Sequence, residues 1–114
     1  YGHVLVDGGM AATVPVAIAE KYKPQLIIAV NVSPHALEPG RKDSFAQHIP
    51  AQKAALKRAD VLILPDVGSY SAFDDKHNPQ LVAAGEKAAT AALPRIKALL
   101  AKKGIAVRPQ YRSW

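Results

Sequence analysis

Asp7, Gly8 and Gly9 are the residues with the clearest potential for chemistry, because they directly follow a short apolar run at residues 3–6. A run of this kind bounded by glycine is typical of a parallel strand buried on both faces, which would place Asp7 at the strand's carboxyl end. Ligands bind at that edge of open α/β sheets. A carboxylate there can accept the proton of a hydroxyl nucleophile, and the glycines permit a sharp turn beside it. Taken alone, the three residues favour the simpler interpretation that Asp-Gly-Gly is only a turn.

Other residues offer weaker signals. Asn31 and Ser33 follow the clearest apolar run of the chain and are candidates for the mouth of an active site at the same sheet edge. Asp66 and the polar segment 69–75 are typical of a solvated turn. The serines lie outside any Gly-x-Ser-x-Gly motif, and the sequence has no Gly-x-Gly-x-x-Gly, Walker A or His-Glu-x-x-His motif. With four histidines at no metal-ligand spacing and no cysteine, we expect no metal site.

The elements that must position these residues alternate between strand and helix. Besides residues 3–6, apolar runs predict strands, and spacings of three or four predict helices. The predicted strands are residues 25–32, 61–64 and an edge strand at 105–107; the predicted helices are 16–22, 50–59 and 81–103. Pro94 either kinks the last helix or opens a second one, and Gly104 is a favourable stop. The order indicates parallel strands joined by helical crossovers, an α/β fold.

Composition and charge narrow the classes of partner. The chain has 114 residues, of which 49% are hydrophobic and 21% charged, as in an ordinary globular domain. Fifteen basic and nine acidic residues give a net charge of +6. The cations are spread, no run exceeds two, and aromatic residues are few, which argues against nucleic acid as a partner. Diffuse charge of this kind suits peripheral contact with an anionic membrane. No stretch is long and apolar enough to predict a transmembrane helix.

Several segments of the chain together resemble a known family. They are Asp-Gly-Gly at 7–9, Val-Pro-Val at 14–16, and the segments 27–34, 59–68, 71–74, 83–89 and 92–94. In this order they resemble the C-terminal half of bacterial patatin-like phospholipases, over about residues 3–101. The resemblance implies a three-layer α/β/α fold with a mainly parallel sheet, of which residues 1–114 would form a single incomplete domain.

The resemblance also implies an activity. Members of that family are serine acyl hydrolases with a Ser–Asp dyad, and Asp7 matches the aspartate, with Gly8 and Gly9 shaping its turn. The serine elbow and the oxyanion loop lie upstream in the family and have no counterpart here. We therefore expect the chain to act on a lipid ester only together with an N-terminal half that carries Gly-x-Ser-x-Gly, and to be inactive alone.

The alternative is a non-catalytic α/β module for binding or assembly, in which Asp-Gly-Gly is only a turn. The opening residue is Tyr1 rather than Met, and a strand is expected from residue 3, so the chain looks cut from something longer. The sequence does not determine the compartment; cytoplasm or a membrane surface is favoured over a secreted or periplasmic location.

Overall fold

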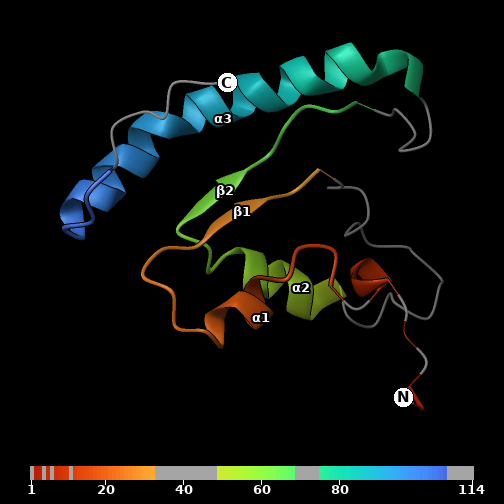
Figure 1. The fold of residues 1–114 in the computed structure, drawn as a ribbon, viewed down its shortest axis with the longest axis horizontal. Coiled ribbons are helices and arrows are strands. Elements are labelled where there is room, and N and C mark those ends of the chain that lie inside the picture. Colours follow the sequence, from red (N-terminus) through yellow and green to blue (C-terminus); the bar gives the residue numbers. More distant parts are fainter. Residues whose placement is uncertain are drawn as a thin grey trace.

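The computed structural model describes residues 2–3, 5, 7–10, 12–32, 49–68 and 75–107. Over these residues the chain is a small mixed α/β domain with a two-stranded parallel sheet and flanking helices (Figure 1). The elements in chain order are η1 (Gly8–Met10), α1 (Val16–Glu20), β1 (Ile28–Val30), α2 (Ile49–Leu56), β2 (Val61–Ile63), η4 (Asp75–His77) and α3 (Asn78–Lys102).

The two strands are parallel because α2 lies between them in the chain and carries the polypeptide back to the starting edge of the sheet. Ile28 is opposite Val61, and Val30 is opposite Ile63. The ladder continues beyond β1, since the Asn31 N–H donates to the Ile63 carbonyl over 3.0 Å. The predicted α/β order is therefore confirmed for the central part of the chain.

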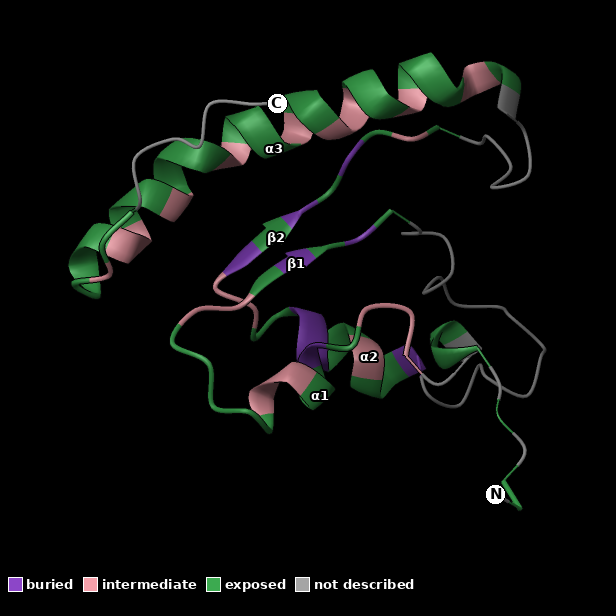
Figure 2. Ribbon diagram, viewed as in Figure 1, coloured by how far each residue is buried: buried purple, intermediate pink, exposed green. Residues whose placement is uncertain are grey.

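The core lies between α1, α2 and one face of β1. Val16, Ala29, Ile49, Ala55 and Leu56 form one buried cluster there. Alternation along β2 turns Val61 and Ile63 to the opposite face, where α3 runs along β2 (Figures 1 and 2). The helices thus lie on both sides of the two strands, α1 and α2 on one and α3 on the other.

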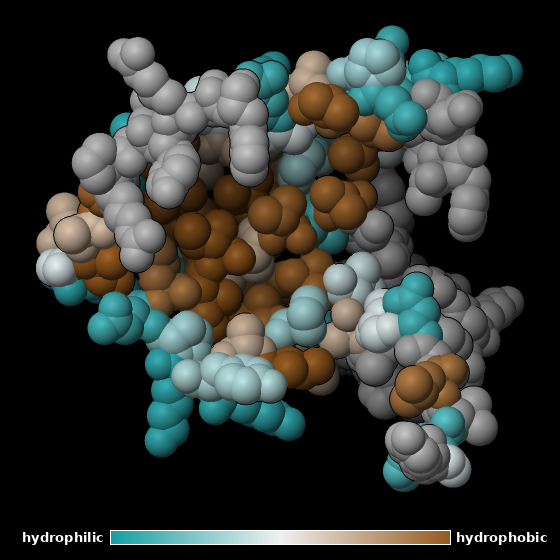
Figure 3. Space-filling model, viewed as in Figure 1, coloured by the Kyte–Doolittle hydropathy of each residue, from teal (hydrophilic) through white to brown (hydrophobic). Residues whose placement is uncertain are grey.

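The strand formed by the apolar run at residues 25–32 is buried on one face only. Along β1 only Ala29 is buried, while Ile28 and Val30 are 43% and 49% exposed. The reason is the position of α3, which packs along β2 and leaves the same face of β1 uncovered. Figure 3 shows the resulting apolar surface between the strands and α3. A continuous apolar run therefore forms a strand here without being covered by a second layer.

The predicted strand at residues 3–6 is also wrong for its described residues. His3 and Leu5 belong to no strand, and the Leu5 side chain is 89% exposed. An apolar run becomes a strand only where a neighbouring strand accepts its backbone hydrogen bonds, and no described strand pairs with Leu5. Val4 and Val6 lie outside the described residues. Of the described residues before Asp7, His3 and Leu5 are exposed and belong to no strand.

The helices match their predicted positions with shifted ends. α1 ends at Glu20, two residues before the predicted end, and α3 begins at Asn78, three residues before the predicted start. α3 is continuous through Pro94, so this residue does not open a second helix. Gly104 ends it as predicted, at φ 66°. No described helix is long and apolar enough to cross a membrane.

The remaining predictions concern the chain ends of these elements. Residues 105–107 follow α3 without forming a strand, so the predicted last edge strand is wrong. The Ile105 N–H instead donates to the Leu100 carbonyl over 2.9 Å, which satisfies the helix terminus. The described residues between η1 and α1 form a bend. Residues 33–48 lie outside the described residues.

Candidate functional site

The Asp7 carboxylate is exposed and held by its own turn. The Gly9 N–H donates to Asp7 Oδ1 over 2.7 Å, the geometry of an aspartate that closes a local turn. The chain then enters η1, and the Ala12 N–H donates to the Gly8 carbonyl over 3.0 Å. Among the described residues, no hydrogen bond or ion pair occupies Asp7 Oδ2. One carboxylate oxygen is thus oriented by the backbone, and the other remains available as an acceptor.

Gly8 and Gly9 play different parts in this turn. A Cβ atom added at Gly9 would lie 3.1 Å from Asp7 Oδ1, which is closer than about nine in ten real Cβ contacts. A Cβ atom added at Gly8 would meet nothing within 4 Å. A side chain at position 9 would therefore displace the Asp7 carboxylate by a few tenths of an ångström, whereas one at position 8 would meet no neighbour.

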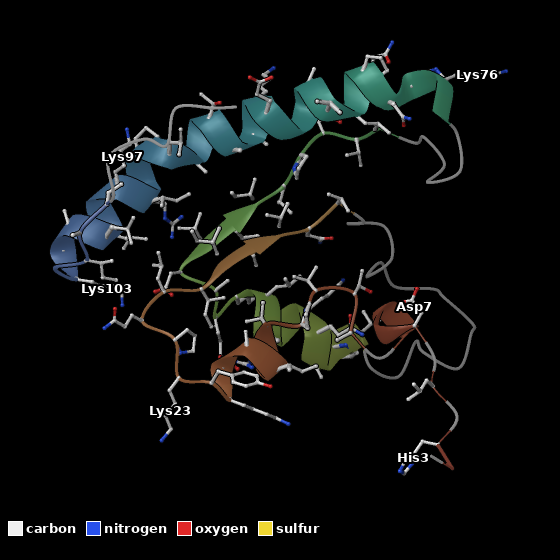
Figure 4. All side chains as sticks on the ribbon, viewed as in Figure 1. His3, Asp7, Lys23, Lys76, Lys97 and Lys103 are labelled. Atoms are coloured by element: carbon white, nitrogen blue, oxygen red, sulfur yellow. The ribbon has the colours of Figure 1, made fainter. Side chains whose placement is uncertain are left out.

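The structure describes Asn31, one of the two residues predicted at the mouth of the site. Asn31 follows β1 directly and is only 4% exposed, while its backbone N–H extends the ladder to Ile63. Ser33 lies outside the described residues. Asp7 lies toward the end of the molecule where β1 and β2 finish (Figure 4). No hydrogen bond between described residues joins Asp7 to Asn31.

Asp66 forms a turn that closely parallels the one at Asp7. It follows β2, its side chain is exposed, and its Oδ1 accepts a hydrogen bond from the Gly68 N–H over 3.3 Å. This agrees with the prediction of a solvated turn at this position. The pair provides an internal comparison: two exposed aspartates with the same local contact, one preceding η1 and one following β2.

Two small cavities open beside these turns. One, of about 240 Å³, lies between α1 and α2 and begins at Ala12, just after η1. Its floor consists of small apolar side chains, and the Gln52 side chain at its rim accepts a hydrogen bond from the Thr13 N–H over 3.2 Å. The other, of about 320 Å³, lies between the end of β2 and α3, with Asp66 and Lys87 among its lining residues. Both cavities are bounded mainly by alanine and aliphatic side chains.

Sequence reasoning missed the polar contacts that hold these elements together. The Ile27 N–H donates to Asp60 Oδ2 over 2.8 Å, and the Arg95 guanidinium donates to the Asp60 carbonyl over 2.7 Å. Asp60 thus ties the start of β1 to the start of β2 and to α3. In the sequence Asp60 is only the residue that follows the predicted helix at 50–59. A contact between residues 33 positions apart leaves no local signal in the sequence.

A second missed contact joins α1 to the end of α2. Arg58 donates two hydrogen bonds to the Glu20 carboxylate, over 2.6 and 2.7 Å. This bidentate bond lowers the pKa of Glu20 below its usual 4.5 and raises the pKa of Arg58. Both side chains are partly exposed, which limits the energy of the pair. The contact holds helices together and lies apart from the Asp7 turn.

The described residues contain no group of three or more histidine, aspartate or glutamate side chains arranged to hold a metal ion. Comparison of the chain with protein-family models, with curated proteins and with solved structures finds no match. The chemistry of the site therefore has to be argued from its own residues.

Proposed function

We propose that the chain is the aspartate-bearing part of a lipid acyl hydrolase of the patatin-like type, in which Asp7 is the base of a Ser–Asp dyad. The observation that carries the proposal is the state of Asp7. Its carboxylate is exposed, one oxygen is held by the Gly9 N–H, and the other has no partner among the described residues. Those are the properties required of a base that receives a proton from a group brought in by another part of the protein.

The proposed reaction needs a serine within a Gly-x-Ser-x-Gly motif, and the present sequence contains no such motif. In it, Asp7 Oδ2 accepts the proton of a serine hydroxyl from a Gly-x-Ser-x-Gly segment upstream, as the serine oxygen attacks the ester carbonyl. Collapse of the tetrahedral intermediate releases the alcohol, which takes up the proton, and leaves an acyl-enzyme. Water then attacks the acyl-enzyme with Asp7 again as base, and the fatty acid departs. No metal or organic cofactor takes part in these steps.

Two further features support the proposal. The parallel βαβ unit formed by β1, α2 and β2 is the repeating unit of a larger parallel sheet, in keeping with the proposed three-layer α/β/α domain. The uncovered side chains of Ile28 and Val30 leave apolar surface that additional strands and helices of such a domain would bury. The N-terminal half of the domain is the proposed partner that would extend this sheet and bury this apolar surface.

One observation favours the competing function, a non-catalytic module. The Asp7–Gly9 hydrogen bond closes the turn without help from any other element, and Asp66 makes the same contact with Gly68. An aspartate can therefore occupy such a turn in this chain for conformational reasons alone. The two functions predict different consequences of removing the negative charge of Asp7.

The decisive experiment compares Asp7→Asn with Asp66→Asn in the protein that includes the Gly-x-Ser-x-Gly segment. Asparagine retains an oxygen that can accept the N–H hydrogen bond, so both turns persist, but it cannot accept the serine proton. We expect Asp7→Asn to lower kcat by about 10²–10⁴-fold, the usual contribution of a general base, and Asp66→Asn to change it by only a few-fold. Equal effects at the two positions, or no Gly-x-Ser-x-Gly segment upstream, would favour the non-catalytic module.

The two glycines provide a second, independent comparison. Gly9→Ala shifts the Asp7 carboxylate by a few tenths of an ångström, whereas Gly8→Ala meets no neighbour. If the orientation of Asp7 matters for turnover, Gly9→Ala lowers kcat with little change in KM, and Gly8→Ala leaves both near wild type. Equal activity of the two variants would show that the turn geometry is not used in the reaction.

A further inference from the structure

Six of the nine lysines in the described part of the chain lie toward the end of the molecule opposite Asp7. All three helices finish there, because each one leads back toward the edge where the strands begin (Figure 1). We call this surface the lysine-rich edge; its members are Lys21, Lys23, Lys57, Lys97, Lys102 and Lys103, and all six side chains are exposed. Figure 4 shows Lys23, Lys97 and Lys103 along this edge and Asp7 at the other end.

The positive charge of the lysine-rich edge is not neutralised by nearby carboxylates. Glu20 is engaged in the bidentate contact with Arg58, and the Asp60 side chain accepts the Ile27 N–H. Within the described part of the chain, none of the six lysines takes part in an ion pair. Lysine in the last turn of a helix is favoured by the helix dipole, which accounts for Lys102 but not for Lys23, in the loop beyond α1.

Tyr22 adds an exposed aromatic ring to this edge. Its side chain is 83% exposed and stands between Lys21 and Lys23 at a loop tip. Lys23 has φ 51°, a conformation that lysine rarely adopts, so the tip is a tight turn that projects from the domain. An exposed tyrosine flanked by lysines is the combination found at membrane–water interfaces, where the ring lies at the depth of the headgroups.

We infer that the lysine-rich edge binds the surface of an anionic phospholipid bilayer. Attraction to such a surface requires several exposed cations and no directional pairing, which the lysines of this edge provide. RNA is the less favoured partner, because base stacking uses several aromatic side chains and Tyr22 is the single aromatic residue at the described edge. The inference does not depend on the proposed hydrolysis.

The test is co-sedimentation of the 114-residue chain with vesicles of phosphatidylcholine and phosphatidylserine, compared with vesicles of phosphatidylcholine alone. Lys21→Gln/Lys23→Gln is the test variant, and Lys76→Gln/Lys87→Gln, which has the same net charge, is the control. A lysine near an anionic surface contributes about fivefold to partitioning. We therefore expect the test variant to bind up to about 25-fold more weakly and the control to stay near wild type. Tyr22→Ala should also weaken binding, and higher salt should weaken it for all variants.

Three outcomes would overturn the inference. Equal losses in the two double variants would mean that net charge rather than this edge controls binding. Binding to phosphatidylcholine alone at the same strength would assign it to the apolar surface over β1. Tighter binding of a labelled single-stranded RNA, lost in Lys21→Gln/Lys23→Gln, would assign the edge to nucleic acid. Circular dichroism of each variant establishes that the helices are retained, so a loss of binding reports on the edge itself.

Discussion

Replacing Asp60 by alanine tests how the two strands and α3 are joined. The substitution removes the carboxylate that accepts the Ile27 N–H over 2.8 Å and leaves that half-buried donor without a protein partner. It leaves the contact of Arg95 intact, because that contact is to the Asp60 backbone carbonyl. The variant therefore isolates a single hydrogen bond between the start of β1 and the start of β2.

The expected cost follows from the charge and burial of this bond. A hydrogen bond to a charged group contributes about 1.5–3 kcal/mol, and partial exposure places Asp60 near the middle of that range. We expect Asp60→Ala to lower the free energy of unfolding by about 2 kcal/mol and Asp60→Asn, which keeps an acceptor oxygen, by about 1 kcal/mol. At this chain length the alanine variant would lose roughly 8–12 °C in Tm.

Urea unfolding followed by circular dichroism measures the effect, with Asp66→Ala as the matched control. Asp66 also accepts a backbone N–H, but over 3.3 Å and at an exposed turn, so its loss should cost less than about 0.5 kcal/mol. If Asp60→Ala were no more destabilising than Asp66→Ala, the contact between Asp60 and Ile27 would not hold the strands together. Our account of the sheet would then be wrong.

Three further predictions concern the helices. Gly85→Ala should raise stability by about 1 kcal/mol, because Gly85 lies inside α3 with nothing within 4 Å of an added Cβ atom. Gly104→Ala should lower it by about 1–2 kcal/mol, since its φ of 66° disfavours any Cβ atom; equal signs for the two in thermal melts would contradict this. Arg58 lowers the pKa of Glu20 below 4.5, so the pair stabilises the fold above that pH and loses its effect as the pH falls through the lowered pKa. The Tm advantage of wild type over Glu20→Gln should accordingly shrink between about pH 6 and about pH 3, and a pH-independent difference would show that the ion pair contributes nothing.

The sequence by itself was sufficient for the elements whose signals are local. Periodic apolar residues predicted α2 and α3, Pro15 preceded α1, and Gly104 marked the end of α3. The runs around residues 28–30 and 61–63 predicted the two strands, and the intervening helix implied that they are parallel. These features depend on backbone propensity and on residues a few positions apart, so a single sequence carries them.

The Asp7 turn was likewise predictable as a turn, because an aspartate two residues before a glycine closes one with its own side chain. The different surroundings of Gly8 and Gly9 were not predictable, since two adjacent glycines look equivalent in a sequence. Only the position of the carboxylate in space distinguishes them.

The tertiary structure decided which apolar runs are covered and which polar groups meet. Residues 3–6 have the composition of a buried strand, yet Leu5 is exposed, because burial depends on a neighbouring strand rather than on the run itself. Residues 105–107 fail to form a strand for the same reason. Asp60 contacts Ile27 because α2 brings the chain back to the start of the sheet. The lysines near the ends of the three helices lie toward one edge because each helix runs back in the same direction. Such contacts arise from chain topology, which brings together residues that the sequence keeps far apart.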